Sequence, residues 1–267
     1  MKIGFIFDES SSKEDLYLIK DNLFVVFDGF NSLDKFVDRD GRTGGLIAAT
    51  IAKNEFSKND KSLKELTARA NKKIKERMLA LNIDINKKNS LWGVVLTAVR
   101  IKDNSFEWAQ IGDSLILVIY KDYSFKLPVK DYNHDKEVLN LWKELGEQKK
   151  ENIRELIDKG PLIELRGKMN KTYGVLNGEE EAISFLHVEE ENLQDIKHIL
   201  LFTDGLIIPK ENPLEDDDWG LFVKLFLEGG IENIKKFIRN LQKNDPKCWK
   251  YPRYKQYDDI AAISISF

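Results

Sequence analysis

The sequence contains a single cysteine and only three histidines among its 267 residues. One cysteine, Cys248, excludes an internal disulfide and any zinc site built from cysteines, a pattern typical of a reducing compartment. An excess of either charge is also missing, since 42 basic residues stand against 45 acidic ones and the formal net charge is −3. Without a basic field to hold a phosphate backbone, the chain is not expected to bind nucleic acid. We expect a cytoplasmic protein.

Long hydrophobic runs are absent as well. Residues 91–101 form an apolar run that is far shorter than the roughly 20 residues needed to cross a bilayer. The apolar start at residues 3–7 is short and is followed by Asp8 and Glu9, so no secretory signal is expected. The composition, 42% hydrophobic and 10% aromatic, is that of a globular protein. Neither a repeat nor a low-complexity linker divides the sequence, which predicts one domain over residues 1–267 and no membrane partner.

Hydrophobic periodicity predicts strands near both ends and in the middle of the chain, with helices between them. The expected strands cover residues 2–8, 15–19, 24–29, 91–101, 105–111, 115–120, 123–127, 182–188, 197–202 and 260–267. Helices are expected over 43–56, over 62–81 behind a Ser62–Glu65 capping box, within 131–159 up to Gly160-Pro161, and over 219–227 and 231–241 around Gly229-Gly230. The short turns between residues 91 and 127 predict an antiparallel meander, and residues 167–178 are expected to form a loop.

Several of these strands have an aspartate at or near one end. Asp28-Gly29 and Asp204-Gly205 each close an apolar run, Asp113 lies in a turn before a strand, and Asp258-Asp259 precede the last strand. Each Asp-Gly pair taken alone is more often a simple turn than a ligand. If the strand ends converge, however, they form a group of carboxylates with no obvious cation among them. Donors that are all oxygens favour magnesium or manganese over zinc.

The order of the motifs along the chain is more specific than any one of them. The motifs are Glu14-Asp15, Phe27-Asp28-Gly29, Ile111-Gly112-Asp113-Ser114, Thr203-Asp204-Gly205 and Asp258-Asp259-Ile260. In order and spacing they resemble the type 2C metal-dependent protein serine/threonine phosphatases, the PPM family, in a divergent prokaryote-like form. The resemblance covers essentially the whole chain. It implies an α+β fold, a four-layer α-β-β-α sandwich with two central, mainly antiparallel β-sheets.

The resemblance also implies a site with two Mn²⁺ or Mg²⁺ ions. The metal-binding residues that it implies are Asp28, Gly29, Asp204, Asp258, Asp15 and Glu14. By position, Asp28 would bridge both ions, the Gly29 carbonyl would bind one of them, and Asp204 and Asp258 would complete the second site. The early acidic pair would contact metal through water. The same three aspartates, Asp28, Asp204 and Asp258, are the expected catalytic residues.

Three positions depart from the family pattern. Ser10 stands where the family usually has an arginine that binds the substrate phosphate, Phe30 where many members have a histidine proposed as general acid, and Ile208 where many have an aspartate for a third metal. Another basic residue is therefore expected to bind the phosphate, and Arg42 and Arg253 are the first choices. Further candidates are Arg39, Lys255, Arg166 and Lys168.

We expect a phosphomonoester hydrolase that dephosphorylates phosphoserine and phosphothreonine in proteins through water activated by the two metal ions. A rival that forms an aspartyl phosphate at Asp8 ranks lower, because it usually needs a second aspartate where Ser10 stands. The main alternative is a phosphatase-like module with weak or no turnover, which binds phosphoproteins or partners for regulation. The sequence does not distinguish a phosphoprotein from a phosphorylated metabolite as substrate, and it predicts no oligomeric state.

Overall fold

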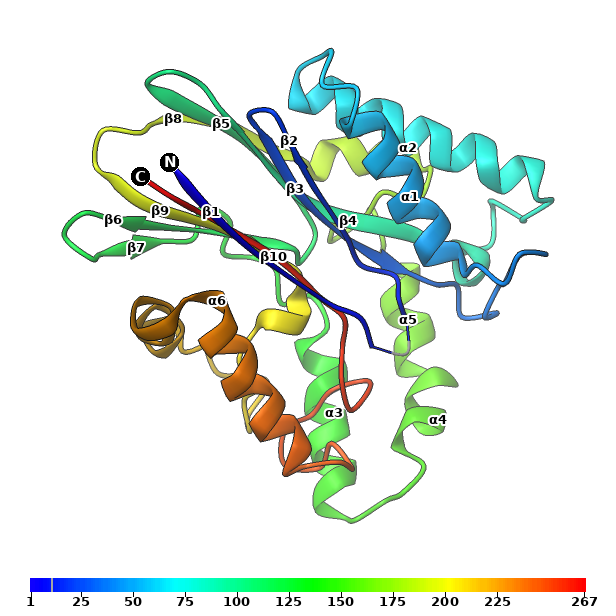
Figure 1. The fold of residues 1–267 in the computed structure, drawn as a ribbon. Helices are drawn as coiled ribbons and strands as arrows, with labels where there is room; N and C mark the ends of the chain where they lie inside the picture. Colours follow the sequence, from blue (N-terminus) through cyan, green and yellow to red (C-terminus); the bar gives the residue numbers. More distant parts are fainter. Residues whose placement is uncertain (11) are drawn as a thin grey trace.

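Two five-stranded antiparallel β-sheets, packed face to face, form the centre of the computed structural model, which describes residues 1–10 and 12–267 (Figure 1). Sheet A has the strand order β1-β10-β9-β6-β7, and sheet B has the order β2-β3-β4-β5-β8. The strands of sheet A are β1 (Lys2–Asp8), β10 (Ile260–Ser266), β9 (Ile196–Phe202), β6 (Leu115–Tyr120) and β7 (Phe125–Lys126). Those of sheet B are β2 (Leu16–Lys20), β3 (Leu23–Phe30), β4 (Gly93–Ile101), β5 (Ser105–Ile111) and β8 (His187–Asn192).

The core between the two sheets is built from side chains that alternate along the strands. In β3, Phe24 and Val26 point into this inter-sheet core, whereas Val25 and Phe27 point to the opposite face and pack against helices. Both faces of β3 are therefore buried, which explains why residues 24–27 are apolar without alternation.

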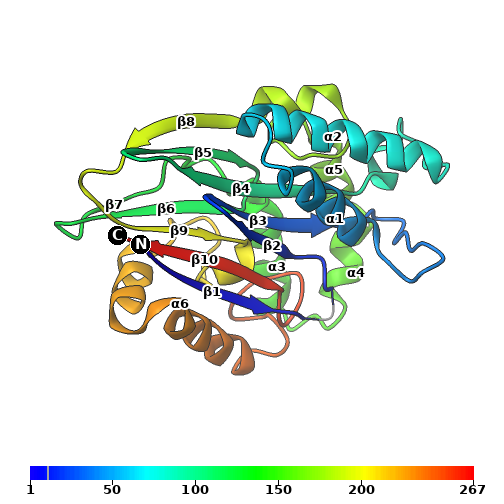
Figure 2. The same cartoon turned by 45° about the horizontal axis from the view of Figure 1, so that its top comes forward.

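Helices cover the outer face of each sheet, which gives four layers (Figures 1 and 2). Helices α1 (Gly44–Phe56) and α2 (Leu63–Ala80) lie on sheet B, and α6 (Trp219–Lys243) lies on sheet A. Helix α6 is interrupted at Gly229 and Gly230, where Gly230 has a φ of 70° that favours glycine. The predicted α+β sandwich with two central antiparallel sheets is confirmed.

Three further helices lie at the end of the sandwich away from the two termini (Figure 2). They are α3 (Lys136–Glu147), α4 (Ile153–Asp158) and α5 (Pro161–Gly167). A small apolar core holds them together, and the buried Cys248 belongs to it; the Trp142 indole N–H donates to the Cys248 carbonyl oxygen at 2.9 Å. Short 3₁₀ helices occur at Lys88–Ser90, Glu180–Phe185 and Asp204–Leu206. Within the described residues, none of the helices has the length and apolar composition of a bilayer-spanning segment.

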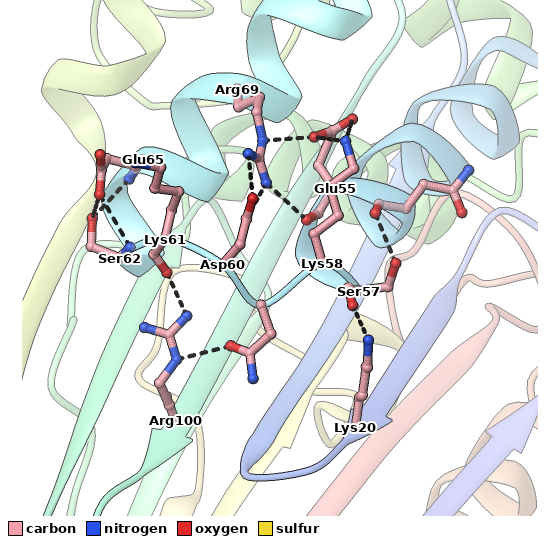
Figure 3. A network of polar contacts seen from close by, with 12 residues as sticks. Lys20, Glu55, Ser57, Lys58, Asp60, Lys61, Ser62, Glu65, Arg69 and Arg100 are labelled. Atoms are coloured by element: carbon pink, nitrogen blue, oxygen red, sulfur yellow. Dashed lines mark hydrogen bonds and ion pairs between the residues drawn. The ribbon is translucent and has the colours of Figure 1, made fainter.

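A network of polar contacts ties α1 and α2 to each other and to sheet B (Figure 3). The Arg69 guanidinium of α2 pairs with Glu55 of α1 at 2.7 Å and with Asp60 of the intervening loop at 2.6 Å. Arg100 of β4 donates to a carbonyl oxygen of the same loop, at 2.7 Å. The predicted capping box at the start of α2 is present. The connection between the two helices is thereby fixed to the sheet beneath it.

Parts of the predicted organisation are wrong. Residues 91–127 do not form a single meander, because the chain crosses from sheet B to sheet A through Gly112-Asp113-Ser114 instead of returning to the same sheet. The strand expected over 182–188 is a 3₁₀ helix that is followed by β8. Pro161 does not end a helix but begins α5. Proline is tolerated there because the N–H groups of the first helical turn form no intrahelical hydrogen bonds.

Candidate active site

Asp28 lies near the end of β3 and faces the space between the sheets. Because side chains alternate along a strand, it shares its face with Phe24 and Val26 of the inter-sheet core. Gly29 follows at a position without room for a side chain, since a Cβ there would lie 2.5 Å from the Gly45 carbonyl oxygen at the start of α1. The Asp-Gly pair thus places a carboxylate at the open end of the core and allows α1 to pack closely behind it.

Glu14 and Asp15 approach the same region from the segment between β1 and β2. The Gly29 N–H donates to the Glu14 carbonyl oxygen at 3.2 Å. Asp259 anchors this segment, because one carboxylate oxygen accepts the Ser10 N–H at 2.5 Å and the other accepts the Glu14 N–H at 2.8 Å. Asp259 is only 1% exposed and serves as an anchor for the acidic pair.

Asp204 and Asp258 come from neighbouring strands of sheet A. Asp204 begins a 3₁₀ helix just after β9, and Asp258 lies just before β10. Two hydrogen bonds of 3.0 Å join these segments, one from the Thr203 N–H to the Ala261 carbonyl oxygen and one from the Ala261 N–H to Thr203 Oγ1. A Cβ on Gly205 would lie 1.9 Å from a backbone oxygen of the segment that leads into β10, so this approach requires glycine.

Asp28, Asp204 and Asp258 line one branched cleft whose two arms share Asp113, Asp135, Asp204 and Tyr254, whereas Glu14 and Asp15 line neither arm. We call the arms the Asp28 arm, of about 160 Å³, and the Asp258 arm, of about 150 Å³. The Asp28 arm is further lined by residues that include Phe30, His134, Arg166 and Tyr173. The Asp258 arm is further lined by residues that include Ile208, Arg253 and Lys255. The structure thus brings Asp28 of β3, Asp204 after β9 and Asp258 before β10 to one cleft.

Burial raises the pKa values of the acids at this cleft, and their mutual repulsion adds to the effect. Burial is the larger cause for Asp15, Asp28 and Asp204, whose pKa values are well above the usual range. The Asp258 charge raises the pKa of Asp15 and Asp204 further, and the Asp15 and Asp204 charges raise that of Asp28. Burial also raises the pKa of Glu14. Buried acids in such a group destabilise the charged folded protein unless a cation joins them.

Two of the acids have buried oxygens without a hydrogen-bond partner, Glu14 Oε1 and Asp15 Oδ2. Carboxylate oxygens are the donors that Mg²⁺ and Mn²⁺ prefer, so the chemistry of this side of the site fits a divalent cation. Across residues 1–10 and 12–267, however, no three Asp, Glu, His or Cys side chains are arranged so that they could hold a metal ion. Asp28, Asp204 and Asp258 line one cleft, and the acids of this region do not converge on a single point.

Lys255, which was considered from the sequence only as a further candidate for phosphate binding, lies among the acids. Lys255 Nζ is 2.5 Å from Asp258 Oδ1 and 2.6 Å from Ser12 Oγ. Burial opposes its charge, but the Asp258 carboxylate, and beyond it Asp204 and Asp28, raise the pKa of Lys255 above its usual value. The lysine is therefore positively charged at neutral pH. The expectation of an acid group without a built-in cation is wrong.

The two arginines chosen for phosphate binding are engaged elsewhere. Arg42 is exposed, pairs with Asp38 at 2.7 Å and Asp40 at 3.0 Å, and does not line either arm. Arg253 lines the Asp258 arm, but its guanidinium pairs with the buried Asp245 at 2.8 Å and donates to backbone carbonyl oxygens. These contacts give Arg42 a role in a surface loop and Arg253 a role in holding the segment before β10.

Arg166 of α5 reaches the Asp28 arm instead. Its guanidinium carbon lies 4.5 Å from the centre of the Phe30 ring, and Nη2 donates to the Asn31 carbonyl oxygen at 3.1 Å. Within the part of the chain that the structure describes, Arg166 forms no ion pair with a carboxylate. Burial lowers the pKa of this guanidinium without removing its charge. Among the arginines considered from the sequence, Arg166 is thus the one that lines the Asp28 arm without a carboxylate partner in the described residues.

Sequence reasoning also missed His134 and Asp135 just before α3. His134 Nε2 lies 3.8 Å from Asp113 Oδ2, and its ring stacks on Tyr173 with centroids 4.0 Å apart. Burial raises the pKa of Asp135, which lines both arms. No local pattern marks these two residues, because residues 131–159 are charged throughout and were expected to be helical.

Comparison with known proteins identifies the family and supports the fold. The family profile described as protein phosphatase 2C matches residues 17–236. The serine/threonine phosphatase Stp1 from Staphylococcus aureus is 16% identical and gives a TM-score of 0.58 over 100% of this chain and 94% of that one. The Mycobacterium tuberculosis phosphatase PstP/Ppp is 14% identical, with a TM-score of 0.59 over 100% and 98%.

A structure of the PstP catalytic domain in complex with two manganese ions is also similar, with 14% identity and a TM-score of 0.58 over 98% of this chain and 96% of that one. No curated protein matches the sequence. At these identities the solved structures show a shared fold, whereas the family profile matches most of the sequence. The chain belongs to the protein phosphatase 2C family.

Proposed function

We propose that this chain is a metal-dependent phosphatase that hydrolyses phosphoserine and phosphothreonine monoesters in proteins. The observation that carries this proposal is the group of buried carboxylates at the strand ends of both sheets, with raised pKa values and two oxygens that lack a partner. A fold is destabilised by such a group unless a cation binds to it. Membership of the protein phosphatase 2C family supports the reaction class, and the relative with two manganese ions supports the kind of metal.

The chain's own acids would hold the metal. Asp28, Asp204 and Asp258 would supply carboxylates from three strands, with the Gly29 carbonyl and the Glu14-Asp15 pair beside them. Divalent ions bound there would lower the pKa of a water molecule and balance the charge of the phosphate. Such chemistry needs no nucleophilic side chain, and the buried Cys248 lies in the small core of α3–α5.

Arg166 would orient the substrate phosphate. Its guanidinium is held by the Phe30 ring on one side and by the Asn31 carbonyl oxygen on another, so little freedom is lost when an anion binds. A guanidinium without a carboxylate partner can donate two parallel hydrogen bonds to a phosphate. Because Arg166 and Asp28 line the same arm, a phosphate bound by one faces the other. This arrangement would replace the arginine that the family usually has where Ser10 stands.

Hydrolysis of p-nitrophenyl phosphate and of a phosphothreonine peptide, each with Mn²⁺, Mg²⁺ or a chelator, tests the proposal. We expect turnover with metal and none with the chelator. Mn²⁺ should raise the melting temperature, because it relieves the repulsion among the acids. Asp28→Asn should abolish turnover and most of that rise. Asp103→Asn, which changes an exposed acid in the turn between β4 and β5, is the matched control and should leave both unchanged.

Absence of metal-dependent hydrolysis for both substrates, together with a melting curve that Mn²⁺ does not move, would contradict the proposal. Hydrolysis of the aryl phosphate without hydrolysis of the peptide would instead favour a small phosphorylated metabolite as the substrate.

A phosphatase-like module without turnover is the second candidate. It is favoured by the pairing of Asp258 with Lys255 and by the lack, in the described residues, of three acids arranged around one point. Such a module would bind the phosphothreonine peptide, as measured by fluorescence anisotropy, and would hydrolyse it with none of the metals.

A further inference from the structure

Strand β1 forms one edge of sheet A and presents an apolar stripe to solvent (Figure 2). The stripe consists of Ile3, Phe5 and Phe7, whose exposed fractions are 38%, 56% and 37%. Because side chains alternate along a strand, these three lie on the face opposite the buried Ile6. The ring centroids of Phe5 and Phe7 lie 5.3 and 5.4 Å from that of Tyr17 in β2. The stripe therefore joins the edge of sheet A to the edge of sheet B.

The backbone groups of the same three residues point away from the sheet. On the far side of β10, the Ala261 carbonyl oxygen accepts the Thr203 N–H that follows β9, at 3.0 Å. Because the backbone groups of successive residues in a strand point to opposite neighbours, the even-numbered residues of β10 bond to β1. The register pairs them with the even-numbered residues of β1. The N–H and C=O groups of Ile3, Phe5 and Phe7 are thus directed outward, where sheet A has no further strand.

The far edges of the two sheets are built differently. Strand β7 has only two residues, and β8 carries consecutive glutamates at positions 189–191. Short edge strands and charged side chains hinder pairing with other chains. Strand β1 is seven residues long, and positions 3–7 contain neither a charge nor a proline. Its edge is therefore open to pairing with another strand.

The sequence of β1 is complementary to itself in one antiparallel register. About a twofold axis at Phe5, Ile3 lies opposite Phe7 of a second copy, and Phe5 lies opposite its own counterpart. All three outward-facing residues then form hydrogen-bonded pairs, each of which exchanges two hydrogen bonds. The same register places Lys2 opposite Asp8 of the second copy, on the face that carries Ile6. Opposite charges therefore meet at both ends of the paired segment, which favours this register.

We propose that the chain forms a homodimer in which two β1 strands pair antiparallel about Phe5, so that the two copies of sheet A become one continuous sheet. The hydrogen bonds of Ile3, Phe5 and Phe7 hold the strands together, and burial of their side chains beside Tyr17 adds apolar contact. A strand from an unrelated protein lacks the matching charges at both ends, so a second copy is the favoured occupant. The paired segment is short, which predicts association in the micromolar range.

Sedimentation equilibrium over a concentration series measures this association. The wild type should shift from monomer to dimer as its concentration rises. Phe5→Lys places two like charges at the axis and should weaken association at least about tenfold. Phe5→Pro removes an N–H that the monomer leaves unpaired and should have the same effect. Leu79→Lys is the matched control, because Leu79 of α2 is 52% exposed, and this variant should associate as the wild type does. Circular dichroism melting verifies that each variant is folded.

Cysteine cross-linking tests the register itself. The natural Cys248 is buried, so a cysteine introduced at the surface is the accessible thiol. Hydrogen-bonded antiparallel pairs have Cα atoms about 5.5 Å apart, within disulfide range, so oxidised Phe5→Cys should yield a covalent dimer and Leu79→Cys should not. Lys2→Glu should weaken association, because it faces Asp8 of the second copy. A wild type that stays monomeric, association that Phe5→Lys and Phe5→Pro leave unchanged, or no cross-link in Phe5→Cys would overturn the proposal.

Discussion

Asp258 and Asp259 are adjacent acids whose replacement should have very different effects on stability. Asp259→Ala removes a buried carboxylate that accepts two backbone N–H groups, at 2.5 Å from Ser10 and at 2.8 Å from Glu14. A hydrogen bond to a charged group contributes about 1.5–3 kcal/mol, so the two bonds predict a loss of about 3–6 kcal/mol. Asp258→Ala breaks a partly exposed ion pair with Lys255, for which the expected loss is about 1 kcal/mol or less.

Urea unfolding of the metal-free proteins at pH 7, followed by circular dichroism, measures both losses. Because a loss of 1 kcal/mol in unfolding free energy lowers the melting temperature of a protein of this size by about 2–4 °C, the Asp259→Ala substitution should lower it by roughly 6–24 °C. Asp259→Asn keeps one carbonyl oxygen as acceptor and should fall between the wild type and the alanine variant. Any Asp259→Ala protein that folds should also bind Mn²⁺ more weakly, because the Glu14 segment has lost its anchor. Equal losses of stability for the two alanine variants would refute the view that Asp259 anchors the Glu14 segment whereas Asp258 is a metal ligand.

Two further predictions concern charge. In the metal-free protein, Asp28→Asn should be more stable than the wild type at pH 8, and this gain should shrink towards pH 5. The reason is that an acid whose pKa is raised by folding contributes stability that is present below its unfolded pKa of about 3.9 and is lost as the pH rises through the folded pKa. Asp28, Asp15 and Asp204 are such acids. A difference in calorimetric melting temperature that does not change with pH would contradict this prediction. Arg166→Ala should raise KM for a phosphothreonine peptide about tenfold, or ~1.4 kcal/mol, whereas Arg42→Ala should leave it unchanged, and equal KM values would exclude Arg166 as the phosphate ligand.

Much of the fold could be predicted because its signals are local. The apolar run of β3, the capping box of α2 and the Gly229-Gly230 break in α6 each act over a few residues. The errors occur where pairing with a strand distant in the sequence determines the structure. Gly112-Asp113-Ser114 has the composition of a hairpin turn, yet β5 pairs with β8 and β6 pairs with β9, both of which come much later in the sequence. Local composition cannot indicate whether the chain returns to one sheet or crosses to another.

The site shows the same division. Asp28 and Asp204 could be found because each is followed by a glycine that the close packing requires. Asp258 and Asp259 look equivalent in the sequence, and only the tertiary contacts separate the acid in the cleft from the anchor beneath it. Lys255 and Arg166 were among the basic candidates, but nothing nearby in the sequence ranks them above Arg42 and Arg253. Their places depend on how β10 and α5 pack.

The position of β10 also governs when the site can form during synthesis. Within sheet A, β1 has β10 as its hydrogen-bonded neighbour, although β1 is translated first and β10 long afterwards. Until residues 260–266 have left the ribosome, β1 has no strand to pair with and one edge of β9 is open to other chains. Lys255 and Asp258 are translated just before that strand. A nascent chain that is stalled before β10 would therefore be prone to aggregation and unable to assemble the cleft.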